Sequence, residues 1–203
     1  MAQAPLYVFW DNSNIYIPAQ TVAGPKEPFA NLKALRIHFE NLVTLVRAGR
    51  RIAKGIVVGS VPPDLQDVWG RLKEIGMEVE LFERGEGSGR EQGVDQCLQV
   101  HMLRTLVDEP PAIAVLLTGD GKGYEDGVGF YADLERMYRK GWGIEVYSWS
   151  IACKPKLRKW AESAGVYVPL EDYYESITFL EGRRPAKSLT KRKHPIAKVK
   201  LMT

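Results

Sequence analysis

Six short segments with strand-like composition alternate along this chain with segments whose apolar residues recur at helical spacing, and this alternation constrains the fold most. Most of the strand segments are apolar throughout, which is typical of strands buried on both faces of a parallel sheet. We therefore predict an α/β, Rossmann-like three-layer fold with a mainly parallel central sheet and helices on both faces. The predicted strands are residues 6–10, 52–59, 77–82, 113–117, 144–149 and 166–168.

Between the strands, glycine and proline mark the ends of five predicted helices. Pro18, Gly24, Pro25 and Pro28 lie close together, so residues 18–28 are predicted to form a loop. The predicted helices are residues 31–48, 64–75, 94–107, 130–140 and 156–163.

The proportions of residue types are those of an ordinary globular protein. Hydrophobic residues make up 45% of the chain and charged residues 26%, which excludes a disordered or collagen-like chain. The longest apolar runs fall far short of the ~18 residues that a membrane span needs. The first five residues show no secretory signal, and Cys97 and Cys153 are too few for a disulfide framework. We expect a cytoplasmic protein with no membrane partner. Nothing in the sequence indicates the oligomeric state, so a homodimer stays open.

The net charge of +3 is distributed unevenly along the chain. Residues 183–203 hold eight of the 28 basic residues and none of the 25 acidic ones, so residues 1–182 carry −5. We predict one domain over residues 1–182 and a basic, flexible C-terminal tail over residues 183–203. Such a tail favours binding to a polyanion, most often a nucleic acid, although solubility alone also explains it.

Polar residues follow two of the predicted strands and begin one of the predicted helices. In an open α/β sheet, ligands bind beyond the carboxyl ends of the strands. Asp11 ends the first strand, Asp120 follows the fourth, Asp126 lies six residues later, and Asp95 is in the first turn of a helix. Each alone is commonly a turn or N-cap residue. Together they repel one another unless a divalent cation, Mg²⁺ or Mn²⁺, lies among them.

Three other motif interpretations fit the sequence less well. The glycines around Lys122 lack the spacing and the Ser/Thr of a phosphate-binding P-loop. Residues 85–89 lack the dinucleotide-binding spacing, and flexibility explains their glycines better. An aspartyl phosphatase needs a second Asp two residues after Asp11, where this chain has Ser13.

Three motifs, taken in their order and context, resemble the NYN domain, a branch of the PIN-like ribonucleases. Residues 11–14 (Asp-Asn-Ser-Asn) resemble its opening Asp-x-x-Asn, residues 93–95 (Gly-Val-Asp) its Val-Asp, and residues 117–120 (Leu-Thr-Gly-Asp) its Ser/Thr-Gly-Asp. The resemblance covers roughly residues 5–168. It implies a strand order of about 3-2-1-4-5, counting the predicted strands along the chain, and a metal-dependent ribonuclease acting on RNA.

By matching positions, the resemblance implies that Asp11, Asp95 and Asp120 bind Mg²⁺ or Mn²⁺, with Asp126 as a fourth acid. Asn14 would orient Asp11 or contact the substrate, and a metal-activated water would give a 5′-phosphate and a 3′-hydroxyl. Two further side chains are candidates for holding a substrate phosphate, because they flank these acids: Arg90 and Lys122. For each of them the sequence slightly favours the simpler interpretation, a solvated loop charge.

The chain departs from the family pattern in two places. The spacing from Asp120 to Asp126 is longer than the family's Asp-x-Asp, and His101 stands where many members carry a second helical acid. These departures leave open an RNA-binding or adaptor module with a degenerate site, and, less favoured, a metal-dependent phosphatase of small substrates. Among the aromatic residues, Trp10 and Trp149 are predicted to be buried, although Trp149, at the carboxyl end of the fifth strand, could instead stack a base. Tyr16 and Phe29 border a loop where substrate could pass.

Overall fold

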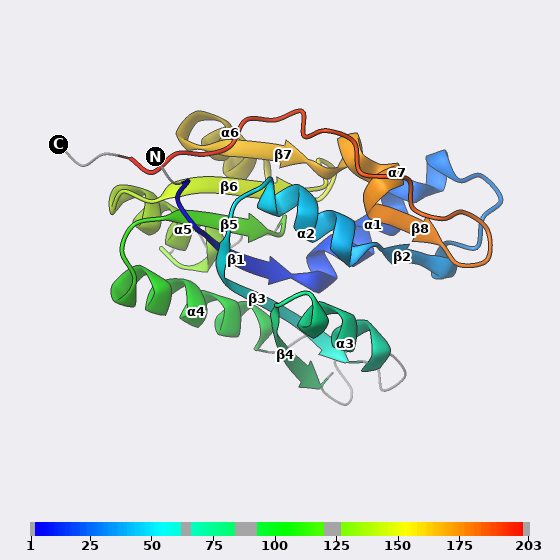
Figure 1. The fold of residues 1–203 in the computed structure, drawn as a ribbon, viewed down its shortest axis with the longest axis horizontal. Coiled ribbons are helices and arrows are strands. Elements are labelled where there is room, and N and C mark those ends of the chain that lie inside the picture. Colours follow the sequence, from blue (N-terminus) through cyan, green and yellow to red (C-terminus); the bar gives the residue numbers. More distant parts are fainter. Residues whose placement is uncertain (1–2, 62–65, 84–92, 120–126, 201–203) are drawn as a thin grey trace.

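The computed structural model describes residues 3–61, 66–83, 93–119 and 127–200. Its centre is a six-stranded parallel sheet between two layers of helices (Figure 1). The strand order is β4-β3-β1-β5-β6-β7. The strands are β1 Leu6–Asp11, β3 Ile52–Val61, β4 Glu78–Glu83, β5 Ile113–Leu117, β6 Gly143–Ser148 and β7 Val166–Pro169.

The predicted three-layer α/β fold is confirmed, and the strand order differs slightly from the prediction. The five strands of the predicted order lie side by side as expected, and β7 extends the sheet at the edge beside β6. Consecutive side chains of β1 point to opposite faces, so Val8 and Trp10 pack on one side while Tyr7 and Phe9 pack on the other. Trp10 is fully buried, as predicted.

Each face of the sheet has its own hydrophobic core and its own helices. One face is covered by α1 Asn12–Lys26, α2 Phe39–Arg47, α3 Gln66–Glu74 and α7 Tyr174–Ile177. The opposite face is covered by α4 Val94–Asp108, α5 Gly129–Arg139 and α6 Pro155–Ala164. The central strands are therefore covered on both faces, which explains their uniformly apolar sequences.

The segment predicted as a loop, residues 18–28, continues helix α1 as far as Lys26. Pro18 and Pro25 lie inside this helix, although an interior proline costs about 3 kcal/mol of helix stability. Tertiary packing compensates for that cost, because one side of α1 is buried in the core. The buried residues of α1 are Ile15, Ala19, Val22 and Ala23.

The segment predicted as one helix over residues 31–48 is divided into three elements. A 3₁₀ turn, η1 Leu32–Ala34, is followed by strand β2 Leu35–Ile37, and α2 begins only at Phe39. Strand β2 pairs in antiparallel fashion with β8 Thr178–Leu180, far away in the chain. This long-range pairing overrides the local helical pattern and forms a second, two-stranded sheet.

The C-terminal segment, residues 183–200, lies along the domain instead of forming the predicted flexible tail (Figure 1). At its start, Nε of Arg184 donates to Oε1 of Glu27 at 2.6 Å. At its end, the backbone N–H of Lys200 donates to the carbonyl of Gly141 at 2.9 Å. Apolar residues between the basic ones, such as Leu189 and Val199, pack against the core. The C-terminal segment is held against the domain because its arginines form ion pairs with carboxylates of the acidic domain.

A buried carboxylate on β6 binds this segment to the rest of the domain. Glu145 is fully buried, and Arg50 donates to both of its oxygens, at 2.7 and 3.0 Å. Nη2 of Arg192, from the C-terminal segment, donates to Oε2 at 3.2 Å, and the N–H of Ala197 donates to Oε1 at 2.8 Å. Burial alone would raise the pKa of Glu145, but the two guanidinium groups outweigh burial and hold the pKa below its usual value.

We predict that Arg192→Met lowers the free energy of unfolding by about 2 kcal/mol, because Glu145 loses one of its two charged donors. Urea unfolding at neutral pH measures the loss. Arg183→Met is the matched control: this arginine lies on the same segment and is exposed, so its loss should change stability by less than about 0.5 kcal/mol.

The pH dependence of stability tests the same interaction. Since the folded pKa of Glu145 lies below its unfolded value of 4.5, the carboxylate stabilises the fold above that pH and loses this contribution as the pH falls through the folded pKa. The free energy of unfolding of the Arg192→Met protein should therefore fall less steeply than that of the wild type as the pH is lowered. If Arg192→Met and Arg183→Met lowered the free energy of unfolding by the same amount, this account of the C-terminal segment would be contradicted.

Candidate functional site

Asp11 is the last residue of the central strand β1, and its side chain is fully buried at the carboxyl edge of the sheet. The backbone N–H of Asn14 donates to Oδ1 of Asp11 at 3.1 Å, and Nδ2 of Asn14 donates to Oδ2. Asp11 thereby caps the N-terminus of α1. Asn14 contacts both oxygens of Asp11, so the carboxylate is held in one orientation.

Asp95, in the first turn of α4, lies at the same edge of the sheet. The preceding Gly93 has φ 95°, and a Cβ there would lie 3.1 Å from the ring of Phe82, near the end of β4. The next residue, Val94, is buried in the core together with Val58, the register partner of Asp11 on β3. The N-terminus of α4 is therefore anchored at the strand ends, and Asp95 is exposed there.

The end of β5 is held by a close backbone contact. Thr118 is fully buried, and a Cβ at Gly119 would lie 2.6 Å from the carbonyl oxygen of Ala152, so only glycine fits. The N–H of Lys154 donates to the carbonyl of Gly119 at 3.0 Å. The chain then enters residues 120–126. Four predicted site residues lie outside the described residues: Arg90, Asp120, Lys122 and Asp126.

Two further oxygen atoms near these elements are buried without a hydrogen-bond partner among the described residues. They are Oδ1 of Asn12, the residue after Asp11, and Oδ2 of Asp133 on α5. Burial raises the pKa of Asp133, and a hydrogen bond from Arg136 at 2.7 Å opposes that shift. None of the sequence motifs includes Asp133, because it lies inside an ordinary amphipathic helix.

The donor atoms at the edge fit a hard divalent cation. Asp11 and Asp95 offer carboxylate oxygens, and Asn12 adds a buried carbonyl oxygen without a described partner. Oxygen donors of this kind are the ligands that Mg²⁺ and Mn²⁺ prefer.

Aromatic side chains on and around α1 divide into buried and exposed ones. Trp149 is fully buried and its Nε1 donates to the carbonyl of Ile15 at 2.8 Å, so the prediction of burial is confirmed and base stacking on it is excluded. Tyr16 is partly buried. Phe29 is fully exposed after α1, with a left-handed φ of 67°, so its ring is accessible to a stacking base.

His101 lies against strand β4, where it contacts a carboxylate and forms part of a cluster that the motifs do not include. Its Nε2 is 2.5 Å from Oε1 of Glu80, and Sγ of Cys97 donates to Oε2 of Glu80 at 2.9 Å. Burial and the neighbouring Glu80 raise the pKa of Cys97 to about 12. The hydrogen bond from Cys97 in turn lowers the pKa of Glu80. The i, i+4 spacing of Cys97 and His101 in the sequence indicates that the two side chains share one side of a helix. Glu80 lies on a separate strand, so the sequence does not indicate that it joins them.

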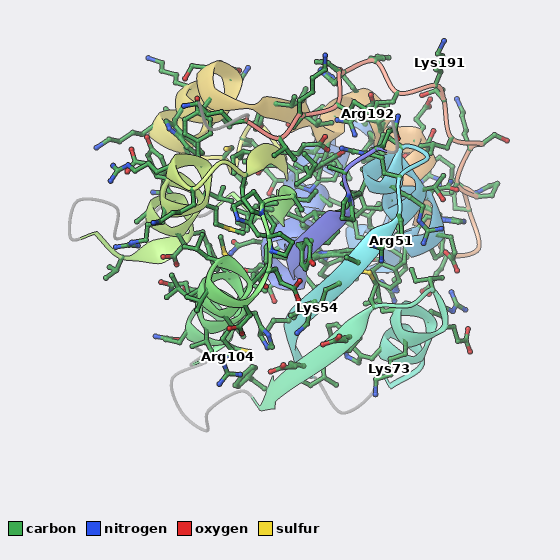
Figure 2. The ribbon with its side chains drawn as sticks, turned by 60° about the vertical axis from the view of Figure 1, so that its left-hand side comes forward. Arg51, Lys54, Lys73, Arg104, Lys191 and Arg192 are labelled. Atoms are coloured by element: carbon green, nitrogen blue, oxygen red, sulfur yellow. The ribbon has the colours of Figure 1, made fainter. Side chains whose placement is uncertain are left out.

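Basic side chains gather at the opposite edge, where the strands begin. Figure 2 shows Arg51, just before β3, and Lys54, near its start, between Lys191 of the C-terminal segment and Lys73 of α3. Arg104 of α4 lies on the same side of the molecule (Figure 2). Nζ of Lys54 is 3.8 Å from Oε2 of Glu78, so this lysine forms an ion pair. The side chain of Lys191 is exposed.

Comparison with known proteins identifies a family and a similar fold. The NYN domain family matches residues 5–171 of the chain. A crystal structure of a protein of unknown function from Vibrio parahaemolyticus is similar, with a TM-score of 0.59 and 16% sequence identity. The match covers 85% of this chain and 96% of that one, and at this identity it supports the fold alone. Comparison with curated proteins gives no significant match. None of the helices in the described parts of the chain combines the length and the apolar composition of a membrane span.

We predict that Asp11→Ala lowers the free energy of unfolding by about 1 kcal/mol, because α1 loses its N-cap, while Asp11→Asn costs clearly less, because Asn caps helices as well as Asp does. Urea unfolding of the two variants measures the difference. An equal loss in both would mean that the charge of Asp11, and not its capping bond, stabilises the fold.

Proposed function

Because the chain belongs to the NYN domain family, within the PIN-like nuclease superfamily, we propose that it is a divalent-metal-dependent ribonuclease that hydrolyses RNA phosphodiester bonds. One observation carries the proposal: the buried, oriented carboxylate of Asp11 lies at the same sheet edge as Asp95. The carboxyl edge of a parallel sheet is where α/β folds bind their ligands.

In this mechanism Asp11, Asp95 and Asp120 hold Mg²⁺ or Mn²⁺, and Asp126 is the fourth acid. When bound, the ion acts as a Lewis acid on the phosphodiester and activates water. Asn14 restricts rotation of the Asp11 carboxylate through its two hydrogen bonds, which supports a fixed ligand geometry. Burial of Asp11 keeps bulk water from competing for its oxygens.

The substrate in this proposal is RNA, held by cations and by an exposed ring. Arg90 and Lys122 contact the phosphate next to the scissile bond, and Phe29 stacks on a base. Exposed lysines of the C-terminal segment, such as Lys191 and Lys193, contact the RNA backbone farther away. The segment then acts as a bound basic surface of the domain, not as a free arm.

One observation favours a second candidate function, an RNA-binding module with a degenerate site. His101 stands where many family members carry a second acid, and its ring contacts Glu80 on β4. A missing acid weakens the affinity of a site for metal ions. In this alternative RNA binds but is not cut, and binding persists when divalent ions are removed.

We predict that the purified chain cleaves RNA in Mg²⁺ or Mn²⁺ and that Asp11→Asn, Asp95→Asn and Asp120→Asn each lower the rate at least about 100-fold, since metal stabilisation of the transition state is worth several kcal/mol. A fluorescent single-stranded RNA reports cleavage. Asp108→Asn is the matched control, because Asp108 is exposed at the far end of α4. Cleavage that persists in EDTA, or that is equal in the Asp11 and Asp108 variants, would refute a metal-dependent site at this edge.

We also predict that Lys191→Gln combined with Lys193→Gln weakens RNA binding and lowers the slope of log K against log salt by about 1.4, because two phosphate contacts to a single strand are lost. Fluorescence anisotropy with the Asp11→Asn protein measures binding without cleavage. The control pair, Lys33→Gln with Lys159→Gln, removes the same charge from exposed positions elsewhere. If both pairs of substitutions changed the affinity and the salt slope equally, RNA binding would depend on net charge alone and not on the position of these lysines.

A further inference from the structure

The cluster of Glu80, Cys97 and His101 has the geometry of a second cation site with different donors. Cys97 and His101 lie one turn apart on α4 and present their side chains to the same side of the helix. Glu80 projects toward them from β4. Their ligand atoms all lie within 4.8 Å of one another.

We propose that Glu80, Cys97 and His101 bind one Zn²⁺ ion between β4 and α4. Sulfur, imidazole nitrogen and a carboxylate oxygen form the donor set that zinc prefers, and hard ions such as Mg²⁺ disfavour it. Three protein ligands leave the fourth tetrahedral position for water.

The size of the cluster fits this ion. Ligand atoms around a tetrahedral zinc stand about 3.5 Å apart, from Zn–S and Zn–N bonds of about 2.3 and 2.0 Å. In the structure Sγ of Cys97 is 2.9 Å from Oε2 of Glu80, and Nε2 of His101 is 2.5 Å from Oε1. Zinc therefore replaces two hydrogen bonds through side-chain movements of about 1 Å. The side chains of Glu80 and His101 are 43% and 13% exposed, so an ion can enter from solvent.

This site is separate from the carboxylate edge, although the two are close. Asp11 pairs with Val58 on β3, and Val58 pairs with Glu80 on β4. Two strand spacings of about 4.8 Å place Glu80 about 10 Å from Asp11 along one row of the sheet. The zinc site is thus independent of the proposed ribonuclease function, and each can fail without the other.

Cobalt absorption tests the proposal on the full chain under reducing conditions. Co²⁺ added alone should give a thiolate-to-metal charge-transfer band and the intense visible bands of a tetrahedral site, and one equivalent of Zn²⁺ should abolish both. Cys97→Ser should remove the charge-transfer band. His101→Gln and Glu80→Gln should weaken Co²⁺ and Zn²⁺ binding at least about tenfold.

Matched controls separate this site from other cation binding. Cys153→Ser removes the other cysteine, which is buried against α6, and should keep the full spectrum. Asp11→Asn should also keep it, whether or not that variant cleaves RNA. Zn²⁺ should raise the unfolding temperature of the wild type but not of Cys97→Ser. Absence of the charge-transfer band in the wild type, or its persistence in Cys97→Ser, would overturn the proposal.

Discussion

The buried charge of Glu145 imposes the constraint on which much of the chain's arrangement depends. An unpaired carboxylate in a protein interior costs several kcal/mol, so cations must be brought to it. Arg50 comes from the connection between α2 and β3, and Arg192 comes from the C-terminal segment. One carboxylate on β6 thereby fixes two distant parts of the chain, and the apolar residues between the tail lysines add packing.

Asp11 is equally buried, and Asn14 donates to both of its oxygens, through the backbone N–H and through Nδ2. A guanidinium pair such as Arg50 with Glu145 neutralises a carboxylate, whereas amide hydrogen bonds mainly orient it. Two hydrogen bonds from Asn14 hold the Asp11 carboxylate in one orientation, which suits a ligand of a cation. A buried carboxylate therefore stabilises the fold at β6, and another provides a candidate metal ligand at β1.

Much of the fold could be predicted because the strands of the main sheet are buried on both faces and so have a local apolar signature. The errors arise where distant contacts override local patterns. Strand β2 forms only because β8 pairs with it, and α1 continues through Pro18 because one side of the helix is buried in the core. The position of the C-terminal segment depends on Glu145. The strand prediction took no account of this one charged residue in an otherwise apolar segment.

The candidate site shows the same division between local and distant information. Asp11 and Asp95 are visible in the sequence because strand ends and helix starts are local features, whereas the Glu80 cluster requires knowledge that β4 packs against α4. The sheet then separates donors by chemistry along one row: oxygen ligands at Asp11 and mixed sulfur, nitrogen and oxygen ligands at Glu80. Because hard cations prefer oxygen donors and zinc prefers sulfur and nitrogen donors, the two proposed sites would select different ions.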